Sequence, residues 1–123
     1  MVDYKLRQVL FLRYKWRLCK HAEEKGLYLA EAEGCLMPQR KSRLHIPFED
    51  GVHMKNSAHY NRMATDFVLY DDTTGSAVTN GDDPRWAELG EFWEGIDPAL
   101  CRWGGRFNPP DPNHFSVTCN GVS

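Results

Sequence analysis

An aspartate inside a strand-like run is the feature of this sequence that most restricts its fold. Residues 65–70, "TDFVLY", are mostly β-branched and aromatic, a composition that favours a buried strand. Asp66 interrupts this run, and carboxylates are seldom buried unless they are paired or bind a metal ion. The fold must therefore supply Asp66 with a partner, and His59 lies only a short distance upstream.

The first part of the chain predicts a helix over residues 3–25. Asp3 is placed to cap its start and Gly26 its end. Apolar residues recur there at helical spacing, with lysine and arginine on the other face. We expect a structural helix that packs over a sheet through this apolar stripe, which consists of Leu6, Val9, Leu12, Trp16 and Cys19.

The remainder alternates between strand patterns and breaks. Strands are predicted at 27–33, 64–70, 76–79, 100–107 and 114–119, and glycines and prolines make 34–56 a long loop. A second helix begins after Asp82 or Asp83 with Pro84 in its first turn, and Trp86, Leu89 and Trp93 line one of its faces. We therefore predict an α+β fold in which an antiparallel sheet has its helices packed on one side, and a single domain over residues 1–123.

Composition limits the possible partners. The net charge of −2 gives no electrostatic case for nucleic acid. The basic run near the start, "KLRQVLFLRYKWRLCK", favours a solvated helix face over a contact with an anionic polymer or a membrane. The sequence has no stretch of transmembrane length and no signal-peptide core. We therefore expect that the protein is made in the cytoplasm and does not insert stably into a membrane. We also expect a monomer and four reduced cysteines.

Four residues form a constellation typical of a metal site. His59 and Asp66 stand in the pattern S-x-H-x6-D, and far downstream Asp111 and His114 form D-x-x-H. Two imidazoles and one carboxylate (His59, His114 and Asp66) suit zinc, and a three-ligand site leaves a position for water. The ion would also compensate the charge of Asp66 in its apolar strand.

Asp111 is the candidate general base. Pro110 and Pro112 flank it and restrict its backbone, so its carboxylate could stand beside the activated water without binding the ion. Simpler interpretations remain for the aspartates and for His114. Asp66 could pair with a basic residue such as Arg62, Asp111 could only shape a proline turn, and His114 could be a core histidine.

The flanking residues resemble a known family. "NSAHYNRMATDF" and "CRWGGRFNPPDPNHF" are similar to the two motifs of the zinc D-alanyl-D-alanine carboxypeptidases and the related bacteriophage L-alanyl-D-glutamate endolysins. The resemblance covers about residues 50 to 120. It implies the hedgehog and D-Ala-D-Ala peptidase-like fold, zinc bound by His59, Asp66 and His114, and Asp111 as the base. It also implies hydrolysis of an amide bond in the peptidoglycan stem peptide.

The substrate end of the site departs from the family pattern. Such enzymes carry an arginine before the first motif that holds a substrate carboxylate or carbonyl, and here Arg40 is the candidate, with Arg43 as the runner-up. The resemblance implies an enzyme consisting of the catalytic domain alone, without a separate wall-binding domain, that acts on the cell wall after release. The alternative function is a zinc-bearing wall-binding or structural module that has lost turnover.

Overall fold

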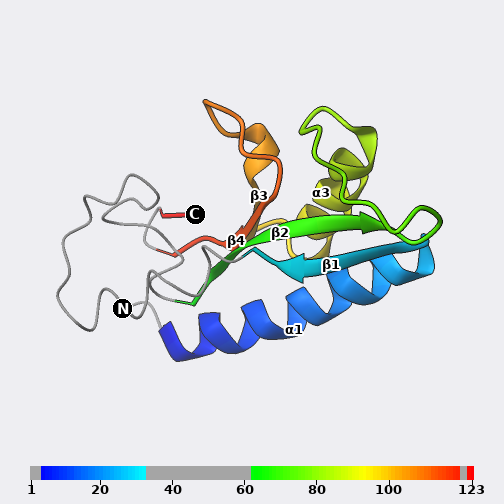
Figure 1. Ribbon diagram of the computed structural model, residues 1–123. Coiled ribbons are helices and arrows are strands. Elements are labelled where there is room, and N and C mark those ends of the chain that lie inside the picture. The colour runs from blue at the N-terminus through cyan, green and yellow to red at the C-terminus, as the bar shows by residue number, and fades with distance from the viewer. Residues whose placement is uncertain (1–3, 33–61, 120–121) are drawn as a thin grey trace, which may run out of the picture.

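The computed structural model describes residues 4–32, 62–119 and 122–123, and these residues have an α+β fold (Figure 1). Helix α1 and strand β1 come first, followed by strand β2 and helix α3, and the short helix η3 lies between strands β3 and β4. This confirms the predicted fold class. The bounds are α1 (Tyr4–Glu24), β1 (Leu27–Glu31), β2 (Ala64–Asp71), α3 (Pro84–Ile96), β3 (Cys101–Trp103), η3 (Gly104–Arg106) and β4 (His114–Val117).

The four strands form one antiparallel sheet in the order β1-β2-β4-β3. The two central strands, β2 and β4, are far apart in the sequence, and their register pairs Thr65 with Phe115 and Asp66 with His114. Because side chains alternate between the faces of a strand, Thr65 and Phe115 share one face and Asp66 and His114 share the other.

Both helices pack on the face that carries Phe115. One cluster of buried residues joins α1 and α3 to that face of all four strands. Several pairs of its aromatic rings meet edge to face, as Trp93 does with Phe115 at a centroid distance of 6.0 Å. The opposite face of the sheet thus carries no described helix. The cluster consists of Phe11, Leu18, Ala22, Leu27, Phe67, Leu69, Trp86, Leu89, Trp93, Cys101, Trp103, Phe115 and Val117.

Helix α1 packs through a different stripe from the one predicted. Phe11, Leu18 and Ala22 are buried against the core, whereas the predicted stripe is exposed or half-buried. Both stripes have helical spacing, so the periodicity of the sequence identifies the helix without deciding which stripe faces the sheet. The exposed residues of the predicted stripe are Leu6, Val9, Leu12 and Trp16, and Cys19 is half-buried.

The segment between β2 and α3 is a turn rather than a strand. Where a strand was predicted at 76–79, only an isolated bridge joins Ala77 to Tyr70. A turn at 80–82 follows at once, and in it the Asp82 N–H donates to the Asn80 side chain. This turn ends the pairing before a ladder can form.

Helix α3 begins as predicted, at Asp83 and Pro84. The side chain of Asp83 accepts a hydrogen bond from the Arg85 N–H, which caps the helix. The Arg85 guanidinium also donates to Asp83 and to Asp71 at the end of β2. The side-chain and backbone hydrogen bonds from Arg85 lower the pKa of Asp83 to about 2. This cluster therefore ties the helix start to the sheet.

Two further findings concern the state of the cysteines and whether a helix could cross a membrane. Cys19, Cys101 and Cys119 carry free thiols, and burial raises the pKa of the Cys101 thiol to about 12, which makes it unreactive. Among the described residues, neither helix has the length and apolar character needed to cross a bilayer.

Candidate metal centre

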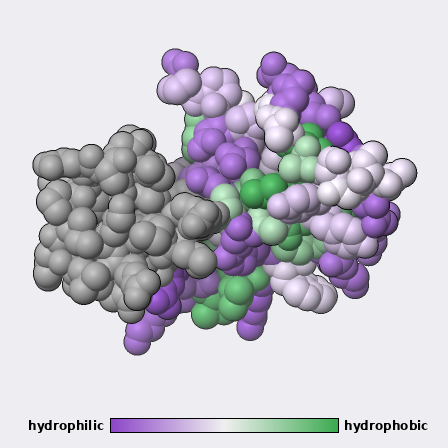
Figure 2. Space-filling model, viewed as in Figure 1, coloured by the Kyte–Doolittle hydropathy of each residue, from purple (hydrophilic) through white to green (hydrophobic). Residues whose placement is uncertain are grey.

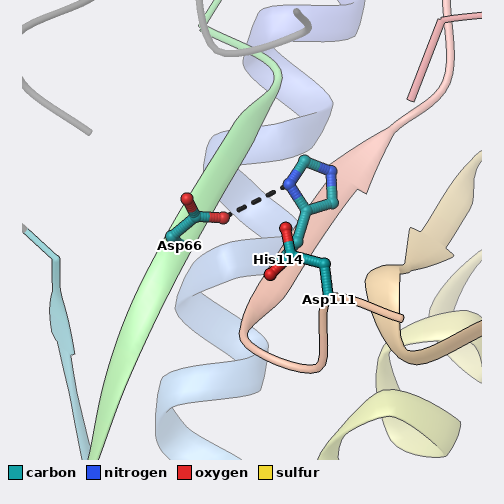
Figure 3. Close-up of side chains that lie close together, drawn as sticks. All are labelled: Asp66, Asp111 and His114. Carbon is teal, nitrogen blue, oxygen red and sulfur yellow. Dashed lines mark hydrogen bonds and ion pairs between the residues drawn. The ribbon is translucent and has the colours of Figure 1, made fainter. Parts of the chain in front are cut away.

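The register of the two central strands brings Asp66 and His114 together (Figure 3). The Nδ1 atom of His114 lies 3.3 Å from Oδ1 of Asp66, on the face of the sheet turned away from α1. The His114 side chain is 7% exposed and that of Asp66 is 33% exposed. An aspartate can therefore occupy an apolar strand because its side chain leaves the core and meets a histidine.

The residues that follow Asp66 and His114 in the sequence pack into the core on the opposite face of the sheet, and this packing fixes both strands. Phe67 follows Asp66 and Phe115 follows His114, and their rings meet edge to face at 5.5 Å in the core. A shift of either strand by one residue would exchange these phenylalanines with the site residues. Core packing thus holds the imidazole and the carboxylate at their separation.

Asp111 reaches the same place from the loop that precedes β4. Its backbone N–H donates to the Gly104 carbonyl at 2.8 Å, and its own carbonyl accepts from the His114 N–H at 3.1 Å. Figure 3 shows its carboxylate beside the His114 ring. The backbone on both sides of Asp111 is therefore held, although its side chain is exposed.

The two residues that follow Asp111 in this loop, Pro112 and Asn113, are hydrogen-bonded to β3 and β2. The Trp103 indole N–H donates to the Pro112 carbonyl at 2.6 Å. Asn113 exchanges two hydrogen bonds with Phe67, one from its side-chain amide to the Phe67 carbonyl and one from the Phe67 N–H to its carbonyl. These contacts place the loop relative to both sheet residues of the site.

The glycines around Trp103 permit this arrangement. A Cβ atom on Gly104 would lie 2.2 Å from the Asp111 carbonyl oxygen and 2.7 Å from Cβ of His114. On Gly90 and Gly105 it would lie 2.1 Å and 2.2 Å from the indole of Trp103. The close packing of the Trp-Gly-Gly sequence thus supports the site.

One ligand atom from each of Asp66, Asp111 and His114 can be chosen so that all three lie within 4.8 Å of one another. Two atoms bound at about 2.1 Å to a tetrahedral zinc ion are about 3.4 Å apart, close to the 3.3 Å between Asp66 and His114. Imidazole and carboxylate are also ligands that zinc accepts. The described residues therefore fit a metal ion of this kind.

Two parts of the predicted site are not described. His59 and the arginines Arg40 and Arg43 lie in residues 33–61, outside the described residues. Their roles stay predictions. The structure brings together three of the four predicted members of the centre, and a carboxylate oxygen of Asp111 lies within 4.8 Å of a ligand atom of each of the other two.

The sequence analysis missed one neighbour of the site. The Phe107 ring contacts the His114 ring, with centroids 5.2 Å apart and planes inclined by 52°. Phe107 follows η3 directly, so its ring packs against the imidazole on the side of β3. An aromatic residue placed between the Trp-Gly-Gly and D-x-x-H motifs was the signal that could have identified it.

Comparison with known proteins adds an independent line of evidence. A protein-family model described as D-alanyl-D-alanine carboxypeptidase matches residues 50–117, more than half of the chain. The matched region contains His59, Asp66, Asp111 and His114. A search of curated proteins found no match.

Proposed function

The chain belongs to the D-alanyl-D-alanine carboxypeptidase family, and on this premise we propose that it is a zinc-dependent peptidase that hydrolyses an amide bond in the peptidoglycan stem peptide. The observation that carries the proposal is the convergence of Asp66, Asp111 and His114 within 4.8 Å, inside the region that the family model matches. A wall-binding module would need no base beside the metal ligands.

The ion would be held by His59, Asp66 and His114. When bound, zinc supplies Lewis-acid chemistry, which activates water near neutral pH and polarises the carbonyl that is attacked. His114 approaches from the buried side of the site, and Asp66 approaches from the neighbouring strand. This donor set leaves room for water, as a catalytic zinc site requires.

Asp111 would manage the proton. Its carboxylate takes a proton from the attacking water and donates it to the leaving amine nitrogen as the amide bond breaks. The backbone hydrogen bonds that join Asp111 to Gly104 and to His114 support this role, because they hold the loop and keep the carboxylate near the ligands. A general base needs this combination of a fixed position and access to solvent.

The substrate side would depend on an arginine. We assign Arg40 to a carboxylate or to the polarised carbonyl of the stem peptide, with Arg43 as the second candidate. The resemblance to phage enzymes further leads us to propose an endolysin, made in the cytoplasm and acting on the cell wall after release. The bond cut would be either L-alanyl-D-glutamate or the terminal D-alanyl-D-alanine bond.

The experiment is digestion of purified peptidoglycan, followed by mass spectrometry of the released muropeptides. We expect products with a new amine and a new carboxylate at one of these two bonds, no products after chelation, and recovery on addition of zinc. Protein that binds zinc and walls but releases nothing would establish the wall-binding alternative. Activity that survives complete removal of metal would contradict the zinc mechanism.

A further inference from the structure

Helix α1 has an apolar stripe on each of two opposite faces. Phe11, Leu18 and Ala22 are buried in the core. Three residues on the other side are exposed, Leu12 by 64%, Trp16 by 65% and Val9 by 46%. Positions 9, 12 and 16 are spaced by three and four residues, so their side chains share one surface. A helix that only covered a sheet would need one apolar stripe, so the second requires an explanation.

The exposed residues are concentrated on this helix. Four of the six exposed large hydrophobic residues belong to α1, the three above and Leu6. Figure 2 shows a hydrophobic patch along the lower side of the molecule, where Figure 1 places α1, with hydrophilic side chains on either side of it. Scattered apolar side chains are normal on a protein surface, whereas a contiguous group marks an interaction site.

Basic side chains share the surface with these apolar ones. Between Tyr4 and Ala22 the helix has six lysines and arginines and no acidic residue. The Lys20 ammonium lies 5.4 Å from the centre of the Trp16 ring. A hollow of about 390 Å³ is lined by Leu12, Arg13, Trp16 and Arg17. We call this surface the outer face of α1, defined by Val9, Leu12, Arg13, Trp16, Arg17 and Lys20.

The charges of the outer face are not balanced within the described part of the chain. Lys15, which points toward β1, pairs with Glu31. Lys25, at the end of the helix, pairs with Glu88 of α3. Among the described residues no carboxylate forms an ion pair with Arg13, Arg17 or Lys20. The outer face therefore presents unneutralised positive charge beside exposed apolar surface.

We propose that the outer face of α1 binds the surface of an anionic lipid bilayer as an interfacial helix. Lysine and arginine would contact the lipid phosphates, while Trp16, Leu12 and Val9 enter the boundary between headgroups and acyl chains. The helix lies on the bilayer without crossing it. Charge complementarity and apolar contact act on the same surface, which is the pattern of helices that bind in this way.

Two other occupants fit less well. A second copy of this chain, related by a two-fold axis, would set these basic side chains against their own equivalents. A soluble polyanion would use the charges and leave the apolar side chains in water. An anionic bilayer uses both properties of the surface.

The position of the metal centre suits this orientation. Asp66 and His114 lie on the face of the sheet turned away from α1, and the outer face of α1 points away from the sheet. A bilayer bound to the outer face would lie on the other side of the sheet from Asp66 and His114. Binding and catalysis can therefore be measured separately.

The experiment is sedimentation of the full chain with vesicles of phosphatidylcholine mixed with phosphatidylglycerol, and with vesicles of phosphatidylcholine alone. Tryptophan fluorescence gives a second readout, because Trp86, Trp93 and Trp103 are buried and Trp16 is exposed. We expect binding to the anionic vesicles only, with a blue shift from Trp16.

Variants separate the two contributions. Arg13→Glu combined with Arg17→Glu should lower the partition coefficient by more than about tenfold. Leu12→Ser combined with Trp16→Ser should lower it by a similar factor, because buried apolar area is lost. Tyr28→Ser is the matched control, since Tyr28 is exposed on β1, and it should bind as the wild type does. Unchanged circular dichroism would show that each variant folds.

Several results would overturn the proposal. One is no sedimentation with the anionic vesicles. Another is full binding by the Leu12→Ser and Trp16→Ser double variant, or an equal blue shift with soluble polyphosphate, which would mean electrostatic adsorption alone. A third is self-association that the same double variant abolishes, which would make the outer face an interface between copies.

Discussion

His114 and Asp66 are 48 positions apart in the sequence, and their side chains meet at 3.3 Å across the two central strands of the sheet. These two side chains form the part of the candidate metal centre that the sheet holds in place. Because each residue comes from a strand that packs into the core on its other face, the separation is set by the fold. Predictions about the site therefore begin with this pair.

Removing the Asp66 carboxylate should weaken metal binding. Asp66→Ala deletes a ligand, so we expect zinc affinity to fall more than about 100-fold and thermal stability in the presence of zinc to fall with it. Zinc titration against a chromophoric chelator measures the affinity. Val68→Ala, on the same face of β2, is the control and should keep its zinc. Equal zinc affinity in Asp66→Ala and the wild type would refute the ligand assignment.

Asp111 should separate catalysis from metal binding. Asp111→Ala should keep its zinc and its fold, since backbone groups hold this loop, and lose about 10²–10⁴-fold in turnover. Zinc content and wall lysis are measured on the same preparation. A variant that lyses walls at the normal rate would mean that the Pro-Asp-Pro segment is only a turn. Loss of zinc would make Asp111 a ligand.

The glycine after Trp103 should be essential to the geometry of the site. Gly104→Ala places Cβ 2.2 Å from the Asp111 carbonyl oxygen, so the loop must move and both stability and turnover should fall. Gly95→Ala in α3 is the control, because a Cβ there meets nothing within 4 Å. Thermal melts and kinetics are compared for both. Gly104→Ala with wild-type kinetics would show that the close contact does not position Asp111.

The substrate arginine is tested by kinetics together with metal analysis. Arg40→Ala should reduce turnover of the stem peptide while zinc content stays unchanged, because its contact would be with substrate. Arg43→Ala is the comparison. If only Arg43→Ala loses activity, the assignment moves to that residue. If neither variant does, the substrate carboxylate is held elsewhere.

The Arg85 cluster predicts a pH-dependent contribution to stability. The pKa of Asp83 is lowered to about 2, first by the side-chain hydrogen bond from Arg85. The pKa of Asp71 is also lowered, first by the hydrogen bond from the Thr73 N–H and then by the one from Arg85. A carboxylate with a lowered pKa in the folded state stabilises the protein above its unfolded pKa, and the contribution disappears as the pH falls through the folded pKa. Arg85→Gln should therefore lower Tm at pH values above about 4 and have little effect near pH 2.

Thermal denaturation across this pH range measures the effect. Arg13→Gln is the control, since Arg13 forms no ion pair with a described carboxylate, and its effect on Tm should not follow the same pH profile. A difference between wild type and Arg85→Gln that is constant from pH 2 to pH 6 would contradict the assignment of the shift to Arg85.

Local signals predicted much of the fold. Asp83 and Pro84 mark the start of α3, and Gly26, at φ 75°, ends α1, because capping depends on the residues at the helix end. The strand around Asp66 was also identified, because residues that favour strands occur along the whole of β2. These elements carry their signals within a few residues.

Features set by long-range contacts were less accessible. The apolar stripe of α1 that enters the core could not be chosen from spacing alone, because the choice depends on how α3 and the sheet meet the helix. The pairing of Asp66 with His114 likewise depends on the register between two distant strands. The role of Gly104 follows from the return of the loop to η3, which no local pattern specifies.

The one-sided placement of the helices has a consequence for how this sequence can change over time. In β2, site and core residues alternate, so inserting or deleting a single residue there would turn Asp66 toward the helices and Phe67 toward solvent. Such length changes would abolish folding and chemistry together. The turn at 72–82 contributes none of the three described members of the centre, and it is there that we expect related chains to gain or lose residues.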